Sequence, residues 1–256
     1  MRLAWVYIKY YFKLFSMKNL ILILFLLVAS QFSFAQSHAL TIKKTVSKIT
    51  DFVPTGWKIL AEAKGDLNKD GLVDVALVIE NKDPKNFIVD TERWGGDTIN
   101  INPRYLLVAF KKTNGLYELA AKNTHFIPTE NSQESPCLTD PFGQEGGIEI
   151  TKGLLQIHMQ NFYSCGAWEI YNFDYTFRFQ NQKFELIGYN KSSLHRSSGD
   201  ETSTTMNFST MKMNYTSGMN AFKDGGKAKT TWKKIKPRKM LELNSITEEA
   251  VDAFEY

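Results

Sequence analysis

The feature of this 256-residue sequence that most constrains its fold is a long succession of short, alternating apolar segments joined by tight turns. The segments are WKILAEA, VDVALVIE, RYLLVAFKK, LYELAAKN, GIEI, LLQIHMQNF, WEIYNFDYTFRFQ, KFELIGYN, TTMNFST, KMNYT and KTTWKKIK. Turn signals at 113–115, 151–153 and 181–182 separate several of them. Parallel strands would need helical crossovers, for which there is no room. We therefore expect a mainly β fold, an antiparallel meander forming a sandwich or an open, barrel-like sheet.

One segment has a different periodicity. Ile42, Val46, Ile49 and Val53 are spaced by four, three and four residues, with lysines opposite. This spacing predicts a short N-terminal amphipathic helix that ends at Pro54 and covers one face or end of the sheet.

Two connections, residues 81–102 and 124–146, are too long for hairpin turns. Connections of this length without secondary structure are uncommon and often functional. Trp94, which precedes two glycines, could present its ring to a ligand or tuck under the sheet.

Residues 1–35 have the features of a leader. From Met17 a lysine and the apolar run NLILILFLLVASQFSFA end at small residues before Gln36, as a signal peptidase site requires. An uncleaved anchor is the alternative, but the apolar core is shorter than the roughly 20 residues of a comfortable span. We expect translation to start at Met17 and the mature chain, residues 36–256, to be a periplasmic or secreted protein without a stable membrane span. No domain boundary is evident, so this chain is expected to be a single β-rich domain with a charged C-terminal tail.

The charge of the mature chain is balanced. Four of the 31 basic residues lie in the leader, which leaves 27 to match the 27 acidic residues, so a nucleic-acid partner has no basis in net charge. The exception is residues 227–239, with seven basic residues, no acidic one, and Trp232 among them. This stripe could bind a polyanion. It could also be an edge strand whose lysines deter pairing with another chain, followed by an acidic tail, Glu242 to Glu255, that neutralises it.

The only two cysteines, Cys137 and Cys165, lie in the exported part. An even number in an oxidising compartment favours a disulfide. The alternative is a cysteine nucleophile assisted by His125 or His158, for which no local signature exists.

The loop GDLNKDGLVD places oxygen-bearing residues at alternate positions. Counting Asp66 as one, Asn68 is three, Asp70 is five and Asp74 is nine. Calcium takes six to eight oxygen ligands, which alternate side chains of a curled loop can supply, and three carboxylates repel one another unless a cation joins them. The alternative is a plain hairpin turn at Asp70-Gly71.

Leu77 stands at position twelve, where an EF-hand has glutamate, and a strand follows instead of a helix. From Gly65 to about Val78 the sequence resembles the calcium loops of FG-GAP and VCBS-type repeats, here in one copy. The resemblance implies a structural Ca²⁺ ion. Because the twelfth-position ligand is absent, water or a residue from another segment must complete the shell, and we expect a dissociation constant of about 10⁻⁵ to 10⁻³ M. The ligands that the resemblance implies are the side chains of Asp66, Asn68, Asp70 and Asp74 and the carbonyl of Leu72.

The wider succession GDLNKDG, DPKN, NPR, FYSCGAW, FELIG, LHRSSGD, NFST and TTWKKIK resembles a group of small secreted proteins from Bacteroidetes-type bacteria. This resemblance implies a compartment and a fold but no activity.

Catalytic motifs are weak. No histidine has a second histidine three to five residues away, so no zinc site is predicted. His195 with Asp200 and Glu201 is the best acid-base grouping and the first place to look for a hydrolase. His158 lies within an alternating strand and is expected to be an ordinary strand residue. The leading hypothesis is a non-enzymatic binding protein that contacts an envelope protein, a glycan or a peptide.

Overall fold

The computed structural model describes residues 40–89, 98–135, 137–143, 145–223, 227–236, 239–247 and 250–251. The chain divides into two units, residues 1–41 and 42–256, and all the elements below belong to the second. The predicted leader, its start at Met17, the cleavage site before Gln36, and Trp94 lie outside the described residues. Within the described part of the chain, no helix has the length and apolar character needed to cross a membrane.

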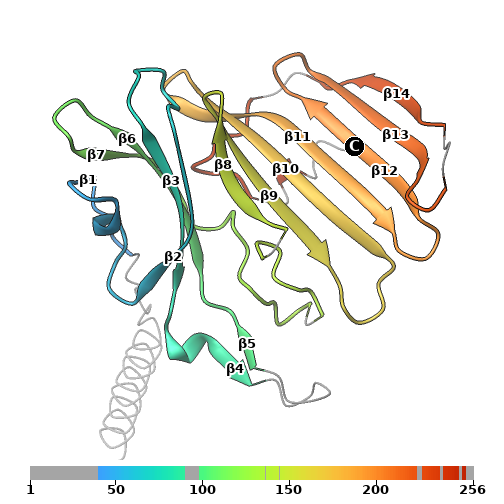
Figure 1. Ribbon diagram of the computed structural model, residues 1–256, viewed down its shortest axis with the longest axis horizontal. Helices are drawn as coiled ribbons and strands as arrows, with labels where there is room; N and C mark the ends of the chain where they lie inside the picture. Colours follow the sequence, from blue (N-terminus) through green and yellow to red (C-terminus); the bar gives the residue numbers. More distant parts are fainter. Residues whose placement is uncertain are drawn as a thin grey trace, which may run out of the picture. The chain divides into compact units, whose positions relative to one another are not determined.

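The fold is mainly β and its sheets are antiparallel, as the alternating segments predict (Figure 1). The larger sheet is a meander of seven strands in the order of the chain, and it does not close into a barrel. Its strands are β8 (Gly147–Thr151), β9 (Leu154–Phe162), β10 (Glu169–Gln180), β11 (Lys183–His195), β12 (Asp200–Asn207), β13 (Lys212–Asn220) and β14 (Lys229–Lys234).

The smaller sheet has five strands in the order β1-β7-β6-β3-β2. They are β1 (Thr45–Val46), β2 (Trp57–Gly65), β3 (Asp74–Asn81), β6 (Arg104–Lys111) and β7 (Tyr117–Asn123). The first long connection, between β3 and β6, contains a short 3₁₀ helix, η3 (Pro84–Asn86), and a two-stranded ribbon of β4 (Phe87–Val89) and β5 (Thr98–Asn100).

Two of the predicted turns show why the meander forms where it does. Asn181 and Gln182, between β10 and β11, have φ angles of 51° and 60°, and Lys152 and Gly153, between β8 and β9, have 54° and 74°. Two successive residues with positive φ match the right-handed twist of paired strands. Such turns also set which residues lie opposite each other in the two strands that they join.

The predicted N-terminal helix over Ile42–Val53 is wrong. The segment forms β1, whose Val46 pairs with Tyr117 of β7, and then a four-residue 3₁₀ helix, η2 (Ile49–Phe52). Six of the twelve residues from Ile42 to Val53 are threonine, valine or isoleucine. These β-branched side chains lose freedom in a helix and favour an extended backbone. Val46 and Phe52 are buried all the same, so the apolar spacing marks a segment that packs without marking a helix.

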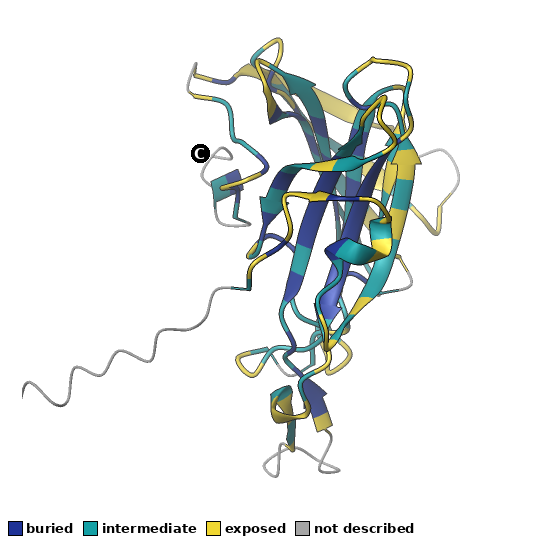
Figure 2. Cartoon of the chain, turned by 90° about the vertical axis from the view of Figure 1, so that its left-hand side faces the viewer, coloured by how far each residue is buried: buried dark blue, intermediate teal, exposed yellow. Residues whose placement is uncertain are grey.

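The two sheets share one core. Alternate residues of β3 and β6, such as Val78 and Leu106, cluster with those of β9 to β11, such as Ile157 and Phe177. The sheets approach each other where β2 lies beside β8, and Gly65 leaves there the space that Ile150 fills. Figure 2 shows the buried residues along the strands and the exposed ones mostly at turns and edges.

The C-terminal segment completes this core. Leu243, Ile246 and Val251 belong to the same apolar cluster, and the side chain of Asn123, at the end of β7, donates to the carbonyls of Leu243 and Ile246. Because one face of the seven-stranded sheet is turned to the core, its other face remains available to solvent or to a ligand.

Candidate functional site

The predicted calcium loop connects β2 and β3 and is held by its own carboxylates. Oδ1 of Asp66 accepts the N–H groups of Lys69 and Asp70 at 2.7 and 3.2 Å, and Oδ2 accepts that of Gly71 at 2.9 Å. Oδ1 of Asp70 accepts the N–H of Leu72 at 2.8 Å, and its Oδ2 accepts the amide of Asn68 at 2.9 Å. The loop therefore curls around its acidic side chains, with Gly71 at φ 84°.

Asp74 has a different environment from the other loop acids. It is fully buried, and its two carboxylate oxygens accept the N–H groups of Leu67 at 2.8 Å and Lys111 at 2.9 Å. Burial raises the pKa of Asp74, although the hydrogen bonds from Leu67 and Lys111 act in the opposite direction. Asp74 thus fastens the start of the loop to the end of β6.

The donor chemistry of the loop suits calcium, since its side chains offer carboxylate and amide oxygens. Backbone N–H groups already offset the repulsion between the carboxylates, however, so the acids do not by themselves require a cation. Among the described residues, no group of three or more histidine, cysteine, aspartate or glutamate side chains is placed to hold a metal ion. A carboxylate oxygen that accepts one hydrogen bond keeps a further lone pair with which it can bind a cation. The calcium ion remains a prediction.

The two cysteines form the predicted disulfide, with Cα atoms 5.5 Å apart, and neither is free to act as a nucleophile. The bond ties the second long connection to the segment between β9 and β10. The N–H of Ser164 donates to the carbonyl of Cys137, and Leu138 pairs with Tyr163 beside it. The long connection is thereby fixed against the end of β9.

The acid-base grouping of His195, Asp200 and Glu201 does not form a catalytic arrangement. Residues between the predicted segments KFELIGYN and TTMNFST extend β11 to His195 and begin β12 at Asp200. Asp200 and Glu201 are successive strand residues and therefore point to opposite faces of the sheet. Nδ1 of His195 lies 3.0 Å from the Ser198 hydroxyl, which donates to Asp200 at 2.7 Å. Hydrogen bonds from Ser198 and Asn220 lower the pKa of Asp200. These contacts close a β-turn and leave no histidine nitrogen between a hydroxyl and a carboxylate, as a triad requires.

The outward face of the seven-stranded sheet carries two rows of polar side chains, which we call the polar face. Cross-strand partners in an antiparallel sheet point to the same side, so the strand register places six side chains in each row. The first row consists of Gln160, Asn172, Ser192, Ser203, Thr216 and Thr230, and the second of His158, Asp174, Asn190, Thr205, Asn214 and Trp232.

Hydrogen bonds between neighbouring strands fix these side chains. Asp174 accepts from the Nδ1 side of His158 at 2.7 Å and from the amide of Asn190 at 3.0 Å, and Asn190 accepts the hydroxyl of Thr205 at 2.9 Å. In the first row, Gln160 donates to Asn172 at 2.9 Å. His158 and Asp174 remain 37% and 41% exposed, so the chain of contacts is held in place while staying within reach of a ligand.

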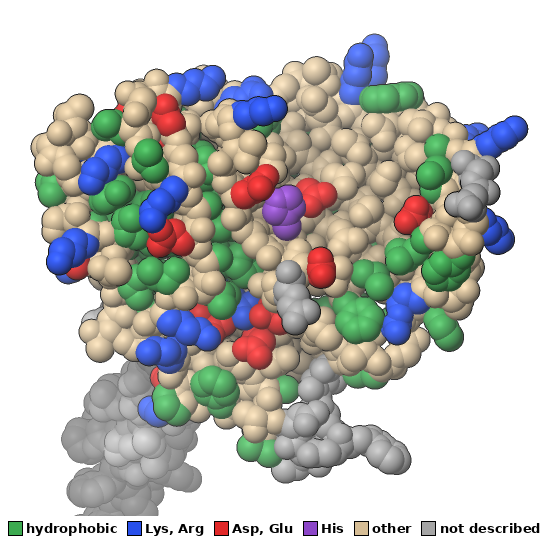
Figure 3. Space-filling view, in the orientation of Figure 1, with side chains coloured by type: hydrophobic (Ala, Val, Ile, Leu, Met, Phe, Trp, Pro, Cys, Tyr) green, Lys and Arg blue, Asp and Glu red, His purple; other side chains and the backbone are tan. Residues whose placement is uncertain are grey.

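Two hollows open on the polar face. One, of about 320 Å³, lies over the first row and is lined by residues that include Asn172, Ser203 and Thr216. The other, of about 410 Å³, is lined by Gln160 and by the disulfide-fixed connection, Asp140 among it. The hydrogen bond between Gln160 and Asn172 joins the two hollows. Figure 3 shows a broad surface of other side chains and backbone on this side of the molecule, with a histidine and a few acidic side chains within it.

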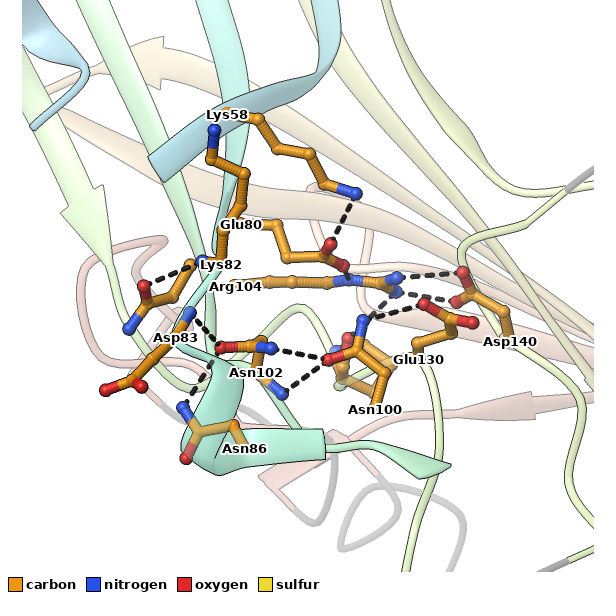
Figure 4. Close-up of polar contacts among 12 residues, drawn as sticks. Lys58, Glu80, Lys82, Asp83, Asn86, Asn100, Asn102, Arg104, Glu130 and Asp140 are labelled. Atoms are coloured by element: carbon orange, nitrogen blue, oxygen red, sulfur yellow. Dashed lines mark hydrogen bonds and ion pairs between the residues drawn. The ribbon is translucent and has the colours of Figure 1, made fainter. Parts of the chain in front are cut away.

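A buried ionic network positions the connection that borders the second hollow (Figure 4). Both terminal nitrogens of Arg104 donate to Asp140, at 2.6 and 2.8 Å, and Nε donates to Glu80 at 2.7 Å. Burial by itself lowers the pKa of Arg104, but the contacts with Asp140 and Glu80 outweigh it and the pKa is raised. Lys58 completes the pairing of Glu80 at 2.7 Å.

Side-chain amides extend this network to the β4–β5 ribbon. Asn102, fully buried, donates to Asn100 at 2.8 Å and accepts from the N–H of Asp83 and the side chain of Asn86, both at 3.0 Å. Asn100 in turn donates to Glu130 at 2.8 Å. The two long connections, expected to be functional because of their length, are thus both fastened to the end of β3 and the start of β6.

Sequence reasoning missed both networks. His158 was expected to be an ordinary strand residue, yet it ends the longest side-chain hydrogen-bond chain of the polar face. The tight turn at 181–182 sets the register where β10 and β11 begin to pair, but a bulge at Thr176 and Phe177 shifts it by one residue before Asp174 and Asn190. No tight turn among the predicted ones joins β9 to β10, so counting along the sequence would not have aligned His158 with Asp174. No local signal marks the burial of Arg104.

Part of the stripe at 227–239 forms the edge strand β14, in line with one of its two interpretations. Among the described residues β14 pairs with β13 alone, and it is exposed throughout. Glu242 of the acidic tail pairs with Lys239 at 3.1 Å and with Lys183 at 2.8 Å. The tail therefore neutralises one end of the stripe.

No family model matches this chain, and no curated protein or solved structure matches it either.

Proposed function

We propose that this protein is a non-enzymatic carbohydrate-binding protein and that its ligand lies along the polar face of the seven-stranded sheet. The observation that carries the proposal is the chemical uniformity of the first row. All six of its side chains are hydroxyls or primary amides, which can donate and accept hydrogen bonds at the same time. A sugar presents the same kind of group at most of its ring carbons.

The composition of this face differs from that of an ordinary solvated sheet. Lysine, glutamate, arginine and aspartate are almost never fully buried, so an ordinary solvated face carries several of them. Across the two rows Asp174 is the one acidic residue, and it is engaged on both sides by His158 and Asn190. A row of uncharged groups that stay partly exposed supports recognition of an uncharged, hydroxyl-rich surface.

Trp232 adds an apolar platform to this arrangement. It stands in the second row on β14, opposite Asn214, and 67% of it is exposed. An indole with one polar edge offers a flat apolar surface at small entropic cost. Its position beside polar side chains supports stacking of the indole against the C–H face of a sugar ring. Neighbouring hydroxyls of the sugar would then bond to Asn214 and Thr216.

A peptide or an envelope protein fits this face less well. Such partners usually bind through an apolar pocket or by adding a strand to a sheet edge. The open edge, β14, carries lysines that oppose strand addition. The hydrolase alternative has no support from the geometry at His195, Asp200 and Glu201.

The test is native electrophoresis through gels that contain soluble polysaccharides, neutral and acidic, at increasing concentration. We expect at least one polysaccharide to retard the protein and Trp232→Ala to abolish most of the retardation. Tyr215→Ala is the matched control, because Tyr215 is an exposed aromatic residue of the same hairpin on the opposite face. Retardation by none of the polymers, or equal loss in both variants, would rule the proposal out.

We also propose export to the periplasm or the cell exterior and a structural calcium ion at the β2–β3 loop. The disulfide supports the first, because such bonds persist in oxidising compartments. The oxygen donors of Asp66, Asn68 and Asp70 support the second, with the Leu72 carbonyl and Asp74 completing the set that the FG-GAP and VCBS resemblance implies.

A further inference from the structure

A third hollow, of about 430 Å³, lies where β13 begins and β14 ends. Its lining contains three lysines, Lys212, Lys234 and Lys236, together with Thr210, Met211 and Ile235. None of the lining residues is acidic. The three lysines are exposed, and no described residue forms a salt bridge with them.

The position of two of these lysines is unfavourable in the protein alone. Lys212 lies directly opposite Lys234 on neighbouring strands, on the outward side of the sheet. Like charges in directly opposed positions repel each other. Lysines on an edge strand deter unwanted pairing, which accounts for Lys234. It does not account for Lys212, since β13 is an inner strand between β12 and β14.

The nearby acidic tail does not relieve this repulsion in the described residues. Glu242 contacts Lys183, which is in β11, and Lys239, which follows Lys236 in the sequence. Neither of these lysines lines the hollow. An external anion would relieve it, because a negative group between two lysines replaces repulsion with attraction.

Two lysines of this cationic hollow lie in line with the polar face along the β13–β14 hairpin. Each rung of the β13–β14 hairpin advances two residues, or about 6.6 to 6.8 Å. The pair Lys212–Lys234 is followed along the hairpin by the pair Asn214–Trp232 and then by Thr216–Thr230. Thr216 lines the hollow over the first row. One extended ligand can therefore reach the lysines, the indole of Trp232 and the hollow over the first row.

We propose that the ligand of the polar face is an acidic polysaccharide. Its carboxylate or sulfate groups bind at Lys212, Lys234 and Lys236, while its rings stack on Trp232 and extend over the uncharged rows. The inference rests on the proposed carbohydrate binding and names the ligand class. A nucleic acid suits the surface less, because it carries a phosphate at every unit. Beyond the Lys212–Lys234 pair the two rows contain no lysine or arginine to hold further phosphates, and the hollow over the first row contains the acidic Glu201.

The experiment compares polymers that differ only in charge. Binding of the full chain to polygalacturonate and to its methyl ester, and to dextran sulfate and dextran, is measured by affinity electrophoresis at low and physiological salt. We expect at least one charged polymer to bind about tenfold more tightly than its neutral counterpart, with the difference shrinking at higher salt. Preference for polygalacturonate identifies a carboxylate ligand, and preference for dextran sulfate identifies a sulfated one.

Two triple variants locate the effect. Lys212→Gln/Lys234→Gln/Lys236→Gln should remove the preference for the charged polymer. Lys43→Gln/Lys82→Gln/Lys85→Gln changes the net charge equally at exposed positions outside the seven-stranded sheet, before β1 and in the connection after β3, and should keep the preference.

Four results would overturn the inference. If the neutral polymers bind as tightly as the charged ones, the ligand is a neutral glycan and carbohydrate binding stands. If both triple variants lose the preference equally, net charge and not this hollow is responsible. If single-stranded DNA binds as tightly as the polysaccharides and loses binding in the first variant, the site takes polyanions of any kind. If no polymer binds, carbohydrate binding fails as well.

Discussion

The molecule contains two networks of polar side chains that are built from similar groups and have opposite surroundings. The network around Arg104 and Asn102 is buried, and its members bond to one another and to backbone groups. The rows of the polar face are also linked across strands, but their side chains stay partly exposed. A buried polar group must find its partners within the protein, whereas an exposed one can exchange water for a ligand. The first network therefore holds the fold, and the second is free to bind.

Removing the central charge of the buried network tests this contrast most severely. Arg104→Met leaves Glu80 and Asp140 without their main partner and should lower the free energy of unfolding by about 3 to 5 kcal/mol, measured by urea denaturation. Lys58→Met is the control: Lys58 also pairs with Glu80 but is 47% exposed, so its loss should cost less than about 1 kcal/mol. Equal effects of the two substitutions would show that burial does not set the importance of these charges.

The disulfide links the two regions, since it fastens the connection that contains Asp140 to the end of β9. Replacing both cysteines with serine should lower the free energy of unfolding by about 3 to 4 kcal/mol, because the closed loop spans 28 residues. A reducing agent should destabilise the parent protein by a similar amount and leave the double variant unchanged. A reductant effect on the variant would assign the loss to something other than this bond.

Calcium should stabilise the β2–β3 loop without changing the polar face. At about 10 mM calcium, a dissociation constant of about 10⁻⁵ to 10⁻³ M adds roughly 1 to 4 kcal/mol to the free energy of unfolding, and excess chelator should reverse the rise in thermal midpoint. Asp66→Asn should remove most of the response. If neither calcium nor chelator changes the thermal midpoint, the loop is a turn held by its own hydrogen bonds and binds no calcium.

One substitution made in both networks compares them directly. Asn102→Leu removes the buried amide that accepts the N–H of Asp83 and should cost about 1 to 3 kcal/mol. Asn190→Leu breaks the chain between Asp174 and Thr205, but water can replace the lost amide, so we expect a cost under about 1 kcal/mol. Urea denaturation measures both. A larger cost at Asn190 would mean that the polar face is structural and would count against its role in binding.

Local features of the sequence determined the strands and most of the turns. The predicted segments match β2, β3 and β6 to β10 within two residues at each end, because side-chain alternation and turn chemistry act over a few residues. The segments predicted for β11, β12 and β13 each miss a strand boundary by three to five residues. The N-terminal helix failed for a related reason, since the spacing of Ile42, Val46 and Ile49 reports burial but not backbone conformation. The disulfide could be predicted because two cysteines allow one pairing.

Tertiary structure decided what the polar residues do. From the sequence, Arg104 is a charged residue at the start of a predicted strand. Its burial depends on Glu80 and Asp140, which lie 24 and 36 residues away in the chain. The pairing of Lys212 with Lys234 and the alignment of His158 with Asp174 and Asn190 depend on the register of several strands. Sequence periodicity determines whether a side chain points in or out. Which distant side chains become its neighbours is decided only when the strands pair and one face of the sheet is buried.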